Sequence, residues 1–247
     1  MRRMIRNAKR APAALIVFLC LLSTPLAHAE EDSGYELWVY AWLTALDGNL
    51  GVGPLEAEVG ASFSDVLEGL DFAFMAALRN EQGPWVWTVD VFTANLTNDF
   101  SSNVTVKTDQ QMLRATGGVR LESGMEFFIG ARAMDIRNTL KLRLPDNTVV
   151  SSKGSKSCVD PIVGMGYRGD LSDRLQLVAT ADVGGFGIAS DLSWSATAML
   201  RYHFSERFSM SGGYRILDID YEEGRGNRRF GYDVDTSGPA IALAWQF

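Results

Sequence analysis

From residue 30 onward, the chain is built from short segments in which large apolar residues alternate with small or polar ones. The last segment shows this most clearly. Its odd-numbered positions carry Pro239, Ile241, Leu243, Trp245 and Phe247. The even-numbered positions between them carry Gly, Ala and Gln. Because successive side chains of a β-strand point to opposite faces, this segment predicts a strand with one large apolar face.

The same alternation recurs in other segments, and charged residues stand in the middle of their opposite faces. Four clear examples are 85–91, 113–121, 175–183 and 193–204. In the last of these, Trp194 and Leu200 oppose Thr197 and Arg201. A soluble core buries such charges only at a high cost, whereas a membrane barrel turns apolar groups to lipid and polar groups inward. The pattern favours an all-β, closed antiparallel up-and-down transmembrane β-barrel over a soluble β-sandwich.

The first 29 residues have a different pattern. Basic residues open the chain, an apolar run covers 11–22, and Ala27-His28-Ala29 follows. This order predicts a signal peptide, 1–29, that is cleaved on export. A membrane anchor is the alternative, but the apolar run is shorter than the roughly 20 residues that span a bilayer. Residues 30–247 are then a single barrel domain in the bacterial outer membrane.

Tight connections give the strand count. Four stand out, at 80–83, 122–124, 170–173 and 205–206. Short turns are periplasmic in such barrels, so this placement predicts ten strands with both chain ends in the periplasm. The strands are 35–46, 71–79, 84–95, 104–121, 125–138, 158–169, 174–187, 191–204, 207–221 and 230–247. Eight strands result if two of these are extensions, and twelve if 50–61 joins the sheet.

The outer connections follow from these strands. They are 47–70, 96–103, 139–157, 188–190 and 222–229. In 139–157, Pro145-Asp146-Asn147 predicts a hairpin that projects beyond the membrane. Residues 62–70 form the one helix-like stretch, with a Ser62 cap and apolar residues at helical spacing. This helix lies across the barrel mouth, inside the lumen or on the membrane surface.

Several charged residues fall on the predicted inward faces. They are Asp90, Arg114, Arg120, Glu126, Arg132, Asp160, Arg168, Asp182, Arg201 and Arg215. One interpretation is a plug of ion pairs that makes the barrel rigid. The other is a narrow channel with a basic bias that selects small anionic solutes. Ten strands enclose little space once arginine side chains fill it.

Composition and candidate chemistry narrow the function further. The formal net charge is −7, which argues against binding of nucleic acid. Cys158 is the one cysteine left after cleavage, so no intramolecular disulfide forms. His203-Phe204-Ser205 has an H-x-S spacing found in an outer-membrane lipid deacylase, but a periplasmic strand end and the lack of supporting motifs argue against catalysis. No metal or cofactor motif is present.

Several motifs together resemble an uncharacterised family of proteobacterial outer-membrane β-barrels. They are DFAFM at 71–75, VDPIVG at 159–164, ADVGGFG at 181–187, GYRIL at 213–217, GVGPL at 51–55, SFSDVL at 62–67 and the ending from 238 to 247. The resemblance covers essentially the whole mature chain and implies an outer-membrane barrel, and it provides no catalytic or binding residues to carry over. By architecture alone the chain is similar to small OmpA- and OmpX-type barrels.

The expected function is therefore that of a non-enzymatic integral outer-membrane protein with a structural or surface-interaction role. The alternatives are a narrow solute channel and, more distantly, an envelope-lipid hydrolase. Expected partners are outer-membrane lipids, lipopolysaccharide and the barrel-assembly machinery. The last would recognise the C-terminal strand through Ile241, Leu243, Trp245 and Phe247.

Overall fold

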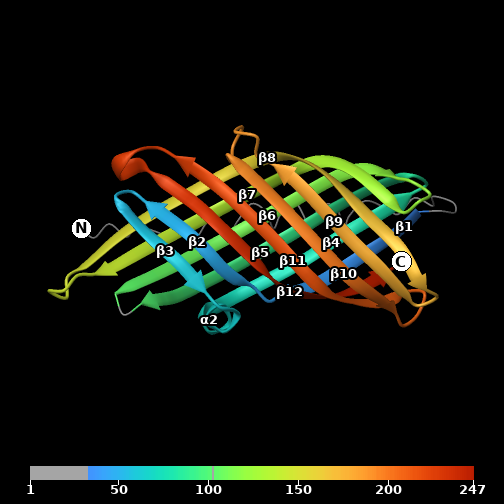
Figure 1. Cartoon of the computed structure of the whole chain (residues 1–247), viewed down its shortest axis with the longest axis horizontal. Helices are drawn as coiled ribbons and strands as arrows, with labels where there is room; N and C mark the ends of the chain where they lie inside the picture. Colours follow the sequence, from blue (N-terminus) through green and yellow to red (C-terminus); the bar gives the residue numbers. More distant parts are fainter. Residues whose placement is uncertain (1–32, 102) are drawn as a thin grey trace, which may run out of the picture. The chain divides into compact units, whose positions relative to one another are not determined.

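A computed structural model describes residues 33–101 and 103–247, and within it antiparallel strands close into a barrel (Figure 1). The predicted signal peptide lies outside the described residues. The strands are β1 (Ser33–Trp42), β2 (Ala45–Val52), β3 (Leu55–Ala61), β4 (Leu70–Gln82), β5 (Trp85–Ser101), β6 (Val104–Arg120), β7 (Met125–Arg143), β8 (Val149–Ser172), β9 (Leu175–Gly184), β10 (Leu192–His203), β11 (Phe208–Glu223) and β12 (Phe230–Gln246). The short helices are α2 (Phe63–Gly69) and the 3-10 turn η1 (Gly226–Arg228).

Ten strands form the closed ring, as predicted. They are β1 and β4 to β12, and the ring closes where β1 pairs with β12, from Glu36 opposite Gln246 to Trp42 opposite Ala240. Further along β12, its partner is β2 instead of β1, and β2 pairs in turn with β3. The segment 50–61 therefore does join the sheet, as a hairpin outside the closed ring.

Strands continue through two of the predicted outer connections, 96–103 and 139–157, and the first of these predictions is wrong. The predicted loop 96–103 is mostly paired strand, since Asp99 stands opposite Thr105 across β5 and β6. The hairpin predicted in 139–157 is confirmed, but it is an extension of the barrel strands themselves: β7 runs to Arg143 and β8 starts at Val149. β8 has 24 residues, well over the about 9–11 that a tilted strand needs to cross a bilayer.

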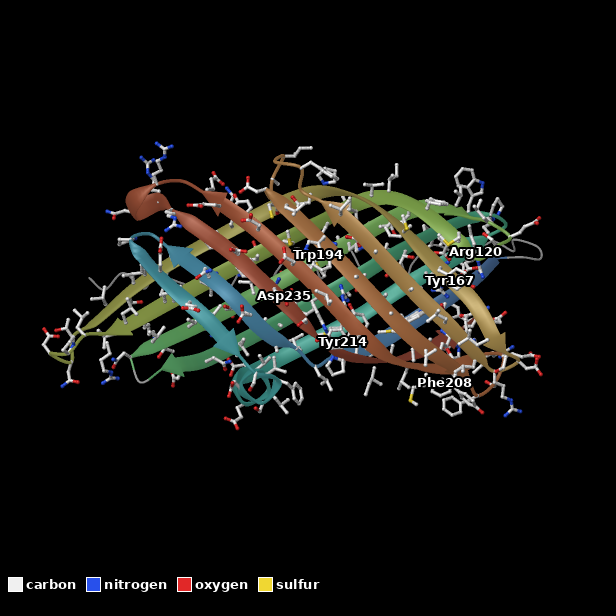
Figure 2. The ribbon with its side chains drawn as sticks, viewed as in Figure 1. Arg120, Tyr167, Trp194, Phe208, Tyr214 and Asp235 are labelled. Carbon is white, nitrogen blue, oxygen red and sulfur yellow. The ribbon has the colours of Figure 1, made fainter. Side chains whose placement is uncertain are left out.

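The outward-facing residues of these long strands change from apolar to polar along the strand. On the outward face of β7, Phe127 and Ile129 lie near the short turns, whereas Arg137 and Lys141 lie near the opposite end. β11 and β12 change in the same way, from Tyr214 and Phe208 to acidic residues such as Asp235 (Figure 2). The apolar part forms a lipid-facing band, and the polar part extends beyond it. By the rule that short turns are periplasmic, the extension points outward from the cell.

Aromatic rings gather at the periplasmic end. Tyr35 packs against Trp87 and Phe247, with ring centroids 6.0 and 5.9 Å apart. Tyr202 packs edge-on against Phe204 at 5.0 Å. Such rings, apolar in body and polar at one edge, suit the boundary between lipid and water.

The C-terminal strand keeps the two faces that its alternation predicts. Ile241, Leu243, Trp245 and Phe247 are exposed on the outside of the barrel. Ala240, Ala242 and Ala244 are buried on the inside, where their small side chains leave room for larger neighbours. The proposed assembly signal thus lies on the lipid-facing surface.

Helix α2 forms where its cap predicts, but its apolar residues do not share one face. The Ser62 hydroxyl accepts the backbone N–H of Asp65, while the Asp65 carboxylate accepts the Ser62 hydroxyl and backbone N–H. These hydrogen bonds lower the pKa of Asp65. Val66 is buried against the barrel, whereas Phe63 and Leu67 are exposed. Within the described part of the chain, no helix is long and apolar enough to cross a bilayer.

The lipid-facing band makes a quantitative prediction. Ile129, 70% exposed, lies on the outward face of β7 within the band, and Thr139 lies on the same face beyond it. We expect Ile129→Arg to lower the free energy of unfolding from lipid vesicles by about 2–4 kcal/mol, and Thr139→Arg by about 0–1 kcal/mol. Urea titrations of both variants measure this. Equal losses would mean that no lipid band lies where the apolar residues place it.

Candidate functional site

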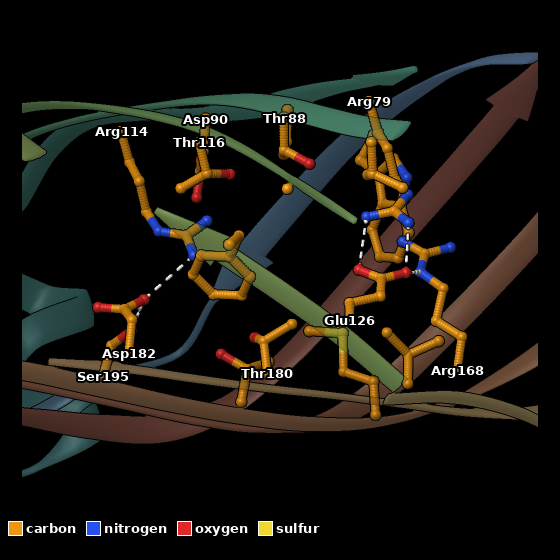
Figure 3. A pocket seen from close by; sticks show the side chains of 18 of the residues that line it. Arg79, Thr88, Asp90, Arg114, Thr116, Glu126, Arg168, Thr180, Asp182 and Ser195 are labelled. Carbon is orange, nitrogen blue, oxygen red and sulfur yellow. Dashed lines mark hydrogen bonds and ion pairs between the residues drawn. The ribbon is translucent and has the colours of Figure 1, made fainter. Parts of the chain in front are cut away.

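Two layers of paired charged residues cross the lumen (Figure 3). The periplasmic layer consists of Glu36, Arg79, Glu81, Arg120, Glu126, Arg168 and Arg201. The middle layer, nearer the outer end, consists of Tyr40, Asp90, Arg114, Arg132, Asp160, Asp182 and Arg215. Each member comes from an inward position of its strand, so the period-2 alternation of the strands sets both layers.

One half of the periplasmic layer is centred on Arg79. Its guanidinium binds both oxygens of Glu126, with 3.1 Å between Nη1 and Oε2, and its Nε donates to Glu81 over 2.8 Å. Glu81 also accepts from Arg120 over 2.7 Å. Arg79 and Glu126 are buried, and three strand steps separate β4 from β7, so this pair reaches across part of the lumen.

The other half of the periplasmic layer is centred on Glu36. Arg201 Nη1 lies 2.8 Å from one Glu36 oxygen, and Arg168 Nη1 lies 3.4 Å from the other. Arg168 Nε is also 3.7 Å from Glu126, which joins the two halves. The ring of Trp38 lies beside both arginines, at 4.2 Å from the Arg201 guanidinium and 5.5 Å from that of Arg168. Because β8 and β1 are on opposite sides of the ring, the ion pair between Arg168 and Glu36 spans the full lumen.

In the middle layer, Asp182 accepts from two arginines. Arg114 Nη2 lies 3.1 Å from its carboxylate, and Arg132 forms a second ion pair with it. Arg132 also donates to Ser193 over 3.1 Å, and Ser195 donates to Asp182 over 2.8 Å. Arg132 is only 1% exposed. Charged groups this deeply buried need several partners each, which the serines of β10 help to supply.

Asp160 is held differently from the other carboxylates. It accepts the Ser190 backbone N–H over 2.8 Å and the Ser190 hydroxyl over 2.7 Å. The Ser193 hydroxyl is 3.3 Å away. Ser190 lies in the connection between β9 and β10, so Asp160 fixes this connection against the inside of the barrel.

A third group completes the middle layer. Arg215 Nη1 donates to the Tyr40 oxygen over 2.9 Å, and Tyr40 donates to Asp90 over 2.7 Å. Arg215 is also 3.7 Å from Asp90 directly. Its guanidinium lies 4.8 Å from the ring centroid of Trp42, on the side of the outer end. The chain of contacts joins β11, β1 and β5 across the barrel.

All ten charged residues proposed from the sequence make an ion pair or a hydrogen bond within these layers. Sequence reasoning missed Arg79, Glu36 and Glu81. Glu36 shares its face of β1 with Trp38 and Tyr40, so strand parity was the signal that would have found it. With these additions, seven arginines face six carboxylates. The basic bias expected of an anion channel thereby falls to one net charge.

A cavity of about 150 Å³ separates the two layers. Threonines line its walls, namely Thr88, Thr116, Thr180 and Thr197, and the arginines Arg79, Arg114, Arg168 and Arg215 border it. Thr88 stands opposite Thr116 on the neighbouring strand, and Thr180 opposite Thr197. The cavity is large enough for water or a small solute, but paired side chains lie above and below it.

The residues of the hydrolase alternative do not form a catalytic pair. Ser205 lies in the tight turn after β10, where its hydroxyl accepts the Phe208 backbone N–H over 3.1 Å. Across the described residues, no hydrogen bond joins His203 to Ser205. Nor does any group of three or more metal-ligating side chains occur within 33–101 and 103–247.

No model of a known protein family matches this chain, and no curated protein sequence is similar to it. Solved structures with a similar fold include the outer-membrane protease OmpT from Escherichia coli, at 8% identity and a TM-score of 0.46, covering 91% of this chain and 100% of that one. The translocator domain of the autotransporter NalP from Neisseria meningitidis is 13% identical, with a TM-score of 0.45 and 95% of each chain covered.

The attachment invasion locus protein Ail of Yersinia pestis is 10% identical, with a TM-score of 0.38. The match covers 88% of this chain and 100% of Ail. At these identities the likeness concerns the barrel architecture alone. The closed ring and its apolar outer band are typical of a transmembrane β-barrel.

The buried network makes a second prediction. Asp182→Asn leaves Arg114 and Arg132 close together in the lumen without their shared carboxylate, so we expect a loss of about 3–5 kcal/mol in the free energy of unfolding. The matched control is Asp135→Asn, which breaks a more exposed ion pair with Arg137 on the outer surface and is expected to cost about 0–1 kcal/mol. Denaturant titration compares them, and a loss at Asp182 no larger than the control would disprove a structural role for the network.

Proposed function

We propose that this protein is a closed, non-conducting outer-membrane β-barrel with a structural or surface-interaction role. The observation that carries the proposal is the pair of charged layers across the lumen. Arg168 and Glu36 connect opposite sides of the ring, and Arg79 with Glu126 fills the space beside them. Each arginine is bound to a carboxylate. Moving an arginine side chain aside to open the lumen would leave that buried carboxylate without its partner, which is costly.

The polar part of the strands beyond the lipid-facing band, here called the outer extension, supports a role at the cell surface. Its strands carry polar residues outward, such as Lys107, Asp109 and Arg137, at a level beyond the lipid-facing band. A barrel that only filled the membrane would need about half the length of β8. We propose that the band contacts outer-membrane lipids, including lipopolysaccharide, and that the extension is presented to the exterior.

Recording from planar bilayers tests whether the lumen conducts. We expect the folded wild-type protein to give no steady conductance steps, because both layers fill the lumen. A general porin reconstituted in parallel shows that the bilayers report open pores.

Channel function, the alternative, makes the opposite prediction. Steady steps from the wild-type protein that fall on Arg132→Ala, and not on the surface control Arg137→Ala, would overturn the closed-barrel proposal. Gel migration of unheated samples confirms that each variant is folded.

We also propose that the barrel-assembly machinery recognises the exposed C-terminal strand. We expect Phe247→Ser to reduce the amount of protein in the outer-membrane fraction severalfold, and Gln246→Ser to leave it unchanged. Phe247 stacks on Tyr35, a contact worth about 0.5–1.5 kcal/mol, so the purified variant should still refold in detergent. Normal cellular assembly of the Phe247 variant would contradict recognition through this residue.

A further inference from the structure

The interior of the outer extension has the composition of a soluble protein core. Beyond the middle layer, the inward positions of β7 change from Glu126 and Arg132 to Met134, Ile136 and Leu140, all of them buried. Inward residues of the neighbouring strands join them in one apolar cluster. The lumen therefore passes from charged to apolar at the level where the outer surface passes from apolar to polar.

Part of this apolar interior is empty. A cavity of about 90 Å³, here called the outer chamber, is lined mainly by apolar side chains. Six that carry the argument are Trp42, Leu50, Val59, Met75, Phe92 and Val106. Trp42 forms its floor, above Arg215. Although Trp42 is only 5% exposed, its indole Nε1–H has no hydrogen-bond partner, which is unusual for a buried donor.

The wall of the outer chamber has a seam between β3 and β5. β3 pairs with β2, and among the described strands it has no partner on its other edge. β4 begins at Leu70 opposite Leu96, so the outer part of β5 pairs with β6 alone. A barrel wall is held by continuous backbone hydrogen bonds, and these are lacking along the seam.

Helix α2 lies at the end of β3 (Figure 1). Its side chains close this end of the seam in place of backbone hydrogen bonds. Val66 packs between Ala61 of β3 and Leu96 of β5, and Val66 and Leu96 also line the outer chamber. Phe63 and Leu67 point away from the barrel and are exposed. The helix is thus apolar toward the chamber and toward the outside.

The position of α2 places one end of the seam, at Ala61 and Leu96, beside lipid. The helix runs directly into β4, where Phe72 and Phe74 are exposed on the lipid-facing side. Phe63 and Leu67 add to the same apolar surface at the outer edge of the band. An apolar molecule in the outer leaflet would therefore meet α2 without crossing water.

We propose that the outer chamber binds one apolar chain, of the width of a single acyl chain, which enters from the outer leaflet through the seam beneath α2. The volume is smaller than the about 150 Å³ that admits a benzene ring, so the chamber favours the end of an aliphatic chain over a ring system. Both free fatty acids and the acyl chains of membrane lipids have this chemistry.

Photo-cross-linking of the full protein in lipid nanodiscs tests this binding site. Two probes carry the same diazirine at the chain terminus: a free fatty acid and a phospholipid. We expect adducts on Met75, Phe92 and Val106, mapped by tandem mass spectrometry, with at least one of the probes. The probe that gives them identifies the source of the chain. Adducts confined to outward residues such as Leu113, with both probes, would overturn the proposal.

A matched pair of variants separates the chamber from bulk lipid. Ala94→Phe fills the chamber and should lower labelling inside it about tenfold, because overpacking a filled cavity costs at least 1–2 kcal/mol. Ala115→Phe makes the same change on the lipid-facing side of β6 and should leave labelling unaltered. Equal labelling of the chamber in both folded variants would contradict binding there.

A reversible closure of the seam tests the route, because the oxidised and reduced forms of one variant carry the same substitutions in the chamber lining. In a Cys158→Ser background, Val66→Cys with Leu96→Cys allows a disulfide between α2 and β5. We expect the oxidised protein to lose the chamber adducts and the reduced protein to regain them. Undiminished adducts in the oxidised protein would show that the chain does not enter beneath α2. This result is independent of whether the barrel conducts ions.

Discussion

Closure of the sheet by β1 and β12 is the interaction on which the rest of this structure depends. Within lipid, each backbone N–H and C=O must find a partner inside the protein, and an open sheet edge leaves a row of them unpaired. The ladder from Glu36 opposite Gln246 to Trp42 opposite Ala240 removes that edge. It also fixes the width of the lumen, so inward side chains from distant strands are brought within reach of one another.

The outer and inner faces of the barrel wall both change composition between the part in lipid and the part beyond it. Inside the lipid band, the outward residues are apolar and the inward ones are charged. The charges must then pair across a narrow space, as Arg168 and Glu36 do. Beyond the band, water surrounds the wall, and the same strands turn apolar residues inward. Most of the seam at β3 lies beyond the band, where water can pair its free backbone groups, and helix α2 covers the end of the seam that meets lipid.

The predicted features that proved correct depend on local patterns. Alternation indicated the strands, four turns separated them, and Ser62 marked the start of α2. The loop predicted at 96–103 was wrong because Thr97 and Asp99 are polar on the outward face, which is typical of loops as well as of strands in water. The hairpin β2–β3 was left open because Gly48 and Gly51 weaken its strand pattern. At Gly48 a glycine is required, since an added Cβ would meet the backbone of Asp233 in β12.

By itself, the sequence determined the all-β class, the face on which each side chain lies and the direction in which the apolar face points. These follow from the two-residue period of a strand, which is a local property. Only the tertiary structure decided which charges meet. Glu36 and Arg168 are 132 residues apart, and they become partners because ring closure places β1 opposite β8. The outer chamber is likewise a product of closure, since it is bounded by strands from both ends of the chain.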